Sequence, residues 1–258
     1  PGRMPKGQFR FYRRVDRVIV VSSVVQAALL AENPRFAPVT RIYGYPIDWT
    51  ALAKPKIPAA GTPVKIGYVG RFHREKGLDL LVESALLLAH RSDLPPWHLL
   101  LCGPRDIVQG GSGEIYATGL ERRLAAALPR DRFALRAPVF SAERLTRLYQ
   151  ELDVFCYPSL ATRGETFGVA VAEAMAAGAV PVVSRLACFD DFVHAGDNGE
   201  VFDHTADDAP VRLADALGRL IVDAPRRHRM ADQARAAVRN YDFPLYAERL
   251  LADFSGLR

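Results

Sequence analysis

From Val64 onward the chain alternates short, mostly apolar segments with longer amphipathic ones. Apolar strands separated by helices are typical of a parallel sheet that is covered by helices on both faces. We therefore expect an α/β fold, with a Rossmann-like parallel sheet flanked by helices. The expected strands are residues 64–69, 97–102, 132–135, 153–157 and 179–183, and the expected helices are residues 78–90, 114–128, 141–151, 167–176, 190–194, 206–223, 226–240 and 243–254.

Loops with glycine and charged residues follow three of the expected strands. Gly70-Arg71 follows the first strand, Gly103-Pro104 follows the second, and the loop 158–165 follows the fourth. Ligands of parallel α/β sheets bind beyond the carboxyl ends of the strands. The order of the elements therefore predicts that these three loops meet at one edge of the sheet.

A shorter unit precedes this alternation. Residues 17–21 and 39–43 are typical of strands, and Ser22 is placed to cap a helix between them. The stretch 54–63 is rich in proline and glycine, which indicates a linker between domains. The front of the chain is therefore expected to form a separate structural unit.

The charge of the chain is concentrated at its front. The formal net charge is +5, with +7 in residues 1–62 and −2 in residues 63–258. A basic front segment on an acidic body argues against a nucleic-acid-binding fold. Basic and aromatic residues alternate over the first 17 residues, which could contact anionic lipid or an anionic acceptor, or could simply be solvated.

The cysteines and the apolar content exclude other classes of protein. Cys102, Cys156 and Cys188 are widely spaced and show neither CxxC nor zinc spacing, so we expect reduced, buried thiols. No apolar run approaches the ~18 residues of a membrane-spanning helix, and no signal peptide is recognisable. We therefore expect a cytoplasmic protein, with peripheral contact to the inner face of the membrane through its basic segment as one option.

The stretch 158–183 combines a loop, a helix of small residues and a buried strand. Gly178 is placed to end the helix, and two acids, Glu165 and Glu173, interrupt the apolar run. A helix N-terminus near Gly168 would offer unpaired N–H groups to an anion, above all phosphate. Neither acid should contact the phosphate, because like charges repel. Each could instead accept hydrogen bonds from hydroxyl groups of a sugar or ribose. From spacing alone, the alternative is a helix with a solvated Glu173, preceded by an acid in the loop, Glu165.

These residues resemble a known family. Glu165-x-Phe167-Gly168, followed by Glu173-Ala174-Met175-Ala176, resembles the two-glutamate motif of family-4 retaining glycosyltransferases, which use nucleotide sugars. Arg71 and Lys76, in GRFHREKG, are similar to the diphosphate-binding motif of the same family. The resemblance extends over roughly residues 14–255. It implies the GT-B fold, in which two Rossmann-like domains enclose the active site.

The resemblance also implies roles for particular residues. Arg71 and Lys76 would stabilise the leaving diphosphate, Glu165 would contact the donor sugar, and Glu173 would hold the ribose. The backbone at Phe167, Gly168 and Val169 would lie beside the sugar and diphosphate, and Gly70 would belong to the same loop as Arg71. The base would lie against Gly103 and the segment ending at Val139. No Asp-x-Asp motif occurs, so we expect a metal-independent mechanism without a cofactor.

The resemblance finally divides the chain into three parts. Residues 1–62 would be the end of an acceptor-side domain with its linker, residues 63–240 the nucleotide-sugar domain, and residues 241–258 a helix that returns to the first domain. Most of the first domain is missing, so we expect the chain to bind nucleotide weakly and to need its missing domain or a partner chain for transfer to a glycan or lipid-linked acceptor. A nucleotide-sugar epimerase or hydrolase, and a non-catalytic binding module, remain alternatives.

Overall fold

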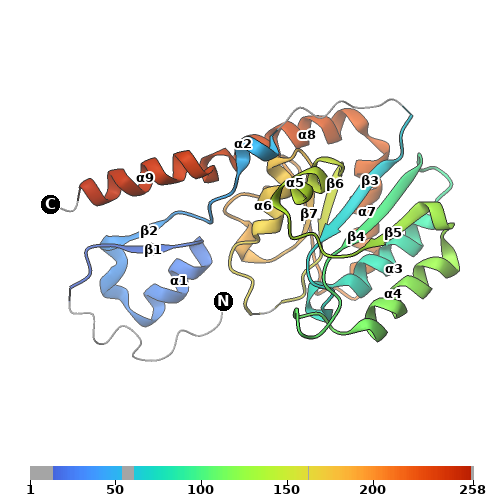
Figure 1. The fold of residues 1–258 in the computed structure, drawn as a ribbon, viewed down its shortest axis with the longest axis horizontal. Coiled ribbons are helices and arrows are strands. Elements are labelled where there is room, and N and C mark those ends of the chain that lie inside the picture. Colours follow the sequence, from blue (N-terminus) through green and yellow to red (C-terminus); the bar gives the residue numbers. More distant parts are fainter. Residues whose placement is uncertain (1–13, 54–60, 162, 257–258) are drawn as a thin grey trace.

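The structure is a computed structural model that describes residues 14–53, 61–161 and 163–256 (Figure 1). Its main body is one six-stranded sheet in the order β5-β4-β3-β6-β7-β8, and all neighbouring strands are parallel. The strands are β3 (Val64–Val69), β4 (Trp97–Cys102), β5 (Phe133–Arg136), β6 (Val154–Tyr157), β7 (Val180–Ser184) and β8 (Glu200–Phe202). The predicted α/β fold class is confirmed.

Helices cover both faces of this sheet. The helices α3 (Leu78–Ala89), α4 (Glu114–Ala127) and α7 (Ala209–Val222) pack together on one face. On the other face lie α5 (Ala142–Gln150), α6 (Val169–Ala176) and α8 (Ala224–Ala237), with the short helix α2 (Trp49–Leu52) against α5 and α6. The aliphatic and aromatic side chains between these layers form one continuous buried core.

The strand order reverses between β3 and β6. The chain moves from β3 outward to β4 and β5, then returns to place β6 on the other side of β3. Such a reversal leaves the loops after the two central strands side by side, and ligands of open α/β sheets bind at this point. The loops that follow β3 and β6 are two of the three loops that the sequence marked as candidate sites.

A smaller unit precedes the main body. It contains β1 (Val18–Val20), α1 (Ser23–Glu32) and β2 (Thr40–Ile42), and β1 and β2 form a two-stranded parallel sheet. Ser22 caps α1 as predicted, because its hydroxyl accepts a hydrogen bond from the Val25 N–H at 3.3 Å. Residues 1–13 and 54–60 lie outside the described residues, so the roles expected of the basic segment and of most of the linker stay predictions.

The last helix, α9 (Phe243–Ser255), runs from the main body alongside the small unit (Figure 1). Asp253 forms an ion pair with Arg17 at 2.6 Å. The rings of Tyr43 and Tyr246 meet edge to face with centroids 5.5 Å apart, and the Tyr43 hydroxyl donates to the Arg249 carbonyl at 3.0 Å. The two ends of the described chain are therefore held together by polar and aromatic contacts.

The structure differs from the predicted elements in three places. The helix expected at residues 190–194 is wrong: a 3₁₀ helix occupies Ala187–Phe189, and Asn198 ties the following segment into a turn by accepting from the His194 N–H at 2.7 Å. The strand β8 was not predicted, since it is three residues long and begins with Glu200. The four-residue α2 was also missed. Further 3₁₀ helices lie at Pro34–Val39, Arg74–Lys76, Arg130–Arg132 and Arg239–Tyr241.

Candidate functional site at the ends of β3 and β6

The loop after β3 contains a short 3₁₀ helix that ends in a left-handed glycine. Arg74–Lys76 form the 3₁₀ turn, His73 caps it by accepting from the Glu75 N–H at 3.3 Å, and Gly77 has φ 70°. A Cβ on Gly77 would lie 1.9 Å from the carbonyl oxygen of Pro158. Only glycine therefore lets the loop after β6 approach this closely.

The loops that follow β3 and β4 also approach each other closely at a glycine. Gly103 has φ 153°, and a Cβ on it would lie 1.8 Å from the carbonyl oxygen of Gly70. The Tyr68 hydroxyl donates to the Arg71 carbonyl at 2.7 Å, which fixes the backbone of the same loop. The loops after β3, β4 and β6 thus meet at the carboxyl edge of the sheet, and the geometric prediction made from element order is confirmed.

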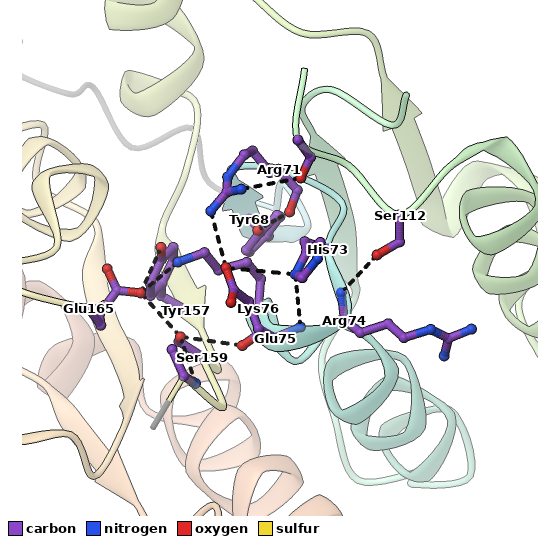
Figure 2. A network of polar contacts seen from close by, with 12 residues as sticks. Tyr68, Arg71, His73, Arg74, Glu75, Lys76, Ser112, Tyr157, Ser159 and Glu165 are labelled. Atoms are coloured by element: carbon purple, nitrogen blue, oxygen red, sulfur yellow. Dashed lines mark hydrogen bonds and ion pairs between the residues drawn. The ribbon is translucent and has the colours of Figure 1, made fainter. Parts of the chain in front are cut away.

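Lys76 and Glu165 form the centre of this meeting point (Figure 2). Lys76 Nζ lies 2.7 Å from Glu165 Oε2, and both side chains are only 11% exposed. The hydroxyls of Tyr157 and Ser159 donate to the same oxygen at 3.3 Å and 3.1 Å. One carboxylate oxygen is therefore held by three donors that come from two loops and the end of β6.

The protonation of this cluster follows from its burial. Burial alone would lower the pKa of the Lys76 ammonium, but Tyr157 and Glu165 outweigh it and raise the pKa. Burial, assisted by the charge of Glu165, raises the pKa of the Tyr157 hydroxyl to about 12. At neutral pH the lysine is thus a cation and the tyrosine is a hydrogen-bond donor.

Arg71 stands beside this cluster with a carboxylate of its own. Its Nη2 lies 3.1 Å from Glu75 Oε1, and its Nη1 donates to the Gly110 carbonyl at 3.3 Å (Figure 2). The guanidinium is more exposed than Lys76, so its pairing with Glu75 is weakened by solvent. The two predicted phosphate-binding cations therefore lie on one loop, and each has a carboxylate partner.

The N-terminus of α6 follows Glu165 closely in the chain. Gly168 caps the helix with φ 87°, and a Cβ on it would lie 2.5 Å from Cε1 of Phe189. The Val169 and Ala170 N–H groups precede the first intrahelical hydrogen bonds, which the N–H groups of Val171 and Ala172 donate to the Gly168 carbonyl. The ring of Phe167 is buried against Phe192 and Tyr241.

Glu173 and the segment that ends at Val139 contact other elements than the Lys76–Glu165 pair does. Glu173 is half-buried on α6; burial raises the pKa of its carboxyl, and a hydrogen bond with Tyr149 of α5 opposes that change. The segment that ends at Val139 lies against the second strand, because the Gly103 N–H donates to the Arg136 carbonyl at 3.4 Å. Within the described residues, Glu173 forms no hydrogen bond or ion pair with Lys76 or Glu165.

A cavity elsewhere on the molecule is lined by arginines whose charges are already paired with carboxylates. This cavity of about 480 Å³ is lined by Arg91, Arg219 and Arg226 among others. Arg91 pairs with Asp93 at 2.7 Å, and the other two arginines pair with Glu200 at 2.9 Å and 2.6 Å. Among the described residues, no group of three or more His, Cys, Asp or Glu side chains could hold a metal ion.

The family model for glycosyl transferases group 1 matches residues 51–237. The chain belongs to this family. The family predicted from the two-glutamate and Gly-Arg…Lys-Gly patterns is therefore confirmed. The matched range includes Lys76, Glu165 and Glu173, so the candidate site lies wholly inside the family region.

Three known proteins illustrate what this chain is similar to in sequence and in fold. The D-inositol 3-phosphate glycosyltransferase of Corynebacterium urealyticum is 32% identical over 207 residues, which is 77% of this chain and 45% of that protein. A glycosyltransferase from Rickettsia africae has a TM-score of 0.78 at 16% identity, covering 100% of this chain and 68% of that one. The Anabaena protein HepE, solved with UDP and glucose, has a TM-score of 0.74 at 19% identity, covering 98% and 68%.

These likenesses establish the GT-B fold and also the extent of the match. The chain spans about half the length of the first of these relatives. No helix in the described part of the chain is both long and apolar enough to cross a membrane.

The sequence alone did not reveal every residue of the candidate site. Tyr157 was assigned only to a strand, and Ser159 only to a loop, yet both hydroxyls donate to Glu165. Arg163 stands two residues before Glu165 in the sequence and could pair with it or meet a phosphate, but the structure pairs the carboxylate with Lys76. The available signal was position, since Tyr157 and Ser159 flank the carboxyl end of a central parallel strand.

Proposed function

We propose that this chain carries the donor site of a retaining glycosyltransferase, which transfers a sugar from a nucleoside-diphosphate sugar to an acceptor. The observation that carries the proposal is the contact between Lys76 and Glu165 at the point where the strand order reverses. A phosphate-binding cation and a hydroxyl-binding carboxylate lie there within hydrogen-bond distance. A sugar linked to a diphosphate presents those two chemistries side by side.

The cations serve the leaving group. When the bond between sugar and phosphate breaks, negative charge develops on the diphosphate, and preorganised donors that face this charge lower the barrier. Arg71 offers a planar fork of donors and Lys76 a compact charge. The N–H groups of Val169 and Ala170 at the start of α6 add partial positive charge. In this proposal these protein groups do the work of a metal ion, so the reaction needs neither metal nor cofactor.

The carboxylates and the glycines position the rest of the donor. Glu165 accepts hydrogen bonds from sugar hydroxyls, and Glu173 accepts them from the ribose. Gly103 and Val139 line the place of the base, on the side of the site formed by β4 and β5. Gly70, Phe167, Gly168 and Val169 place backbone beside the diphosphate and the sugar in this proposal.

In this proposal the acceptor binds to a separate first domain. In the proposed enzyme the first domain, supplied by a longer chain or by a partner, binds a glycan or lipid-linked acceptor and faces the donor across the interdomain space. The basic segment at the front of the chain would hold the cytoplasmic enzyme against an anionic membrane surface. The D-inositol 3-phosphate acceptor named for one relative is a property of that relative.

Titration calorimetry with this chain tests the donor site. UDP, GDP and their sugar conjugates are the probes, and Lys76→Ala is compared with Arg147→Ala, which removes an exposed cation on α5. We expect weak binding of one nucleotide series to the wild type and to Arg147→Ala, and loss of binding in Lys76→Ala. Equal binding by all three proteins would contradict the proposed site.

Transfer is tested with the chain completed to the length of its relatives. Product analysis with a labelled donor separates transfer from hydrolysis and epimerisation, and reports whether the anomeric configuration is retained. Glu165→Ala should lose transfer while it still binds nucleotide. Absence of nucleotide binding in the completed protein would favour a non-catalytic module instead.

A further inference from the structure

We propose that the ion pair between Lys76 and Glu165 makes the site select a diphosphate that carries a sugar over the same diphosphate without one. This inference rests on the proposed function, since it concerns the same donor site. It assigns a specificity role to the contact between the two residues, in addition to the separate roles of each. The selection follows from what happens to Glu165 when a phosphate pairs with Lys76 in its place.

Glu165 depends on Lys76 for its charge compensation. Both side chains are mostly buried, and Lys76 is the one cation that the described residues bring within ion-pair distance of Glu165. A buried carboxylate that loses its only cation is costly, because neither water nor a second charge replaces the lost interaction. A phosphate bound to Lys76 would add a second negative charge beside the first.

Glu165 also cannot turn away from the site at low cost. Its Oε2 accepts from the hydroxyls of Tyr157 and Ser159 as well as from Lys76 (Figure 2). The Tyr157 ring is itself fixed, because it is stacked between Tyr68 and Phe155 at 16° to each, with centroids 5.9 Å and 6.2 Å away. Ser159 is fully buried. The carboxylate is therefore held in place while a ligand competes for its cation.

The second carboxylate oxygen of Glu165, Oε1, explains how a sugar could compensate for the loss of Lys76. No hydrogen bond reaches Oε1 from the residues that the structure describes, so this oxygen can still accept one. Sugar hydroxyls are donors, and a bond from such a donor to a carboxylate is stronger than one between neutral groups. A sugar diphosphate therefore compensates Glu165 as it takes Lys76, whereas a bare diphosphate leaves the carboxylate beside a like charge.

Removing the charge of Glu165 separates these two ligands experimentally. Calorimetry compares the wild type with Glu165→Gln for inorganic pyrophosphate, UDP, UDP-glucose, GDP and GDP-mannose. The control is Glu83→Gln, which removes an exposed charge from α3. In Glu165→Gln we expect bare nucleoside diphosphate to bind about tenfold tighter, a change of about 1.4 kcal/mol. The preference for the sugar conjugate should fall, and Glu83→Gln should behave as the wild type.

A second variant and a folding measurement keep the test valid if Glu165→Gln does not fold. Glu165→Ala also removes the competing charge, and thermal melting by circular dichroism shows whether each variant is folded. Unchanged or weaker binding of bare nucleotide in the folded variants, with binding in the wild type, overturns the inference and leaves the donor site standing. Absence of binding in the wild type, with every probe, overturns the proposed function and the inference together.

Discussion

Lys76 Nζ lies 2.7 Å from Glu165 Oε2, although 89 residues separate the two in the sequence. The contact joins the loop after β3 to the loop after β6, and these strands are neighbours in the sheet. Both side chains are largely shielded from water. The pair is therefore a structural link between two loops as well as the centre of the proposed site.

Breaking this pair should destabilise the protein. Lys76→Met leaves a buried carboxylate without its cation, which we expect to cost about 3 kcal/mol in the free energy of unfolding. Urea denaturation measures the change. The matched control is Glu143→Gln, which breaks an exposed i,i+4 pair with Arg147 on α5 and should cost less than about 1 kcal/mol. Equal costs for the two variants would show that burial of the Lys76 pair has no energetic consequence.

Gly103 should not tolerate a side chain. Gly103→Ala places a Cβ 1.8 Å from the Gly70 carbonyl oxygen, at a φ of 153°, so the backbone before Arg71 must move. We expect a loss of at least about 2 kcal/mol in unfolding free energy and of nucleotide binding. The control is Gly119→Ala on α4, where a Cβ meets nothing within 4 Å and should stabilise the helix by up to about 1 kcal/mol. A similar effect of both substitutions would contradict the close approach of β3 and β4.

Particular residues show what the sequence alone could predict. Apolar strands alternating with helices predicted the parallel sheet, because hydrophobic burial on both faces demands that pattern. The place of Lys76 and Glu165 at one edge followed from the order of the elements. Their direct contact could not be predicted, since it depends on side-chain positions after β3 and β6 align. The contact of the Tyr157 hydroxyl with Glu165 could not be predicted either, because the position of the hydroxyl depends on the rings that stack on Tyr157.

Ionisation of the Tyr157 hydroxyl should lower the free energy of unfolding of the protein in alkaline solution. Its pKa is raised from 10.0 to about 12, so between these values the unfolded chain loses a proton that the folded protein keeps. Stability from this group is complete below pH 10 and is lost as pH rises through 12. Tyr157→Phe lacks this loss, so its deficit against the wild type should shrink, by on the order of 2 kcal/mol, between pH 9 and 12. A constant deficit in urea denaturation over this range would contradict the buried hydroxyl.

Replacing Glu173 with glutamine should raise the thermal stability of the protein at pH 7. Burial raises the pKa of its carboxyl, while Tyr149 partly opposes this, so the folded state disfavours the ionised form at neutral pH. Glu173→Gln keeps an acceptor for Tyr149 and removes the charge, so we expect higher thermal stability at pH 7. A raised folded-state pKa contributes stability fully below the unfolded value of 4.5 and loses it as pH rises, so the gain should vanish near pH 4.

The same variant reports on the proposed ribose contact. Glu173→Gln should weaken nucleotide binding several-fold, because a neutral acceptor bonds a hydroxyl less strongly than a carboxylate does. Calorimetry at pH 7 measures this change, with Glu83→Gln on α3 as the control. A more stable protein with unchanged nucleotide affinity would remove Glu173 from the donor site and leave its hydrogen bond with Tyr149 intact.

The location of the diphosphate is the central claim, and backbone amide NMR of this chain during titration with UDP, GDP and pyrophosphate tests it most directly. The account predicts that the shifting amides cluster in residues 70–77 and 165–170, the loop after β3 and the start of α6. Shifts concentrated instead around Arg91, Arg219 and Arg226 would contradict it.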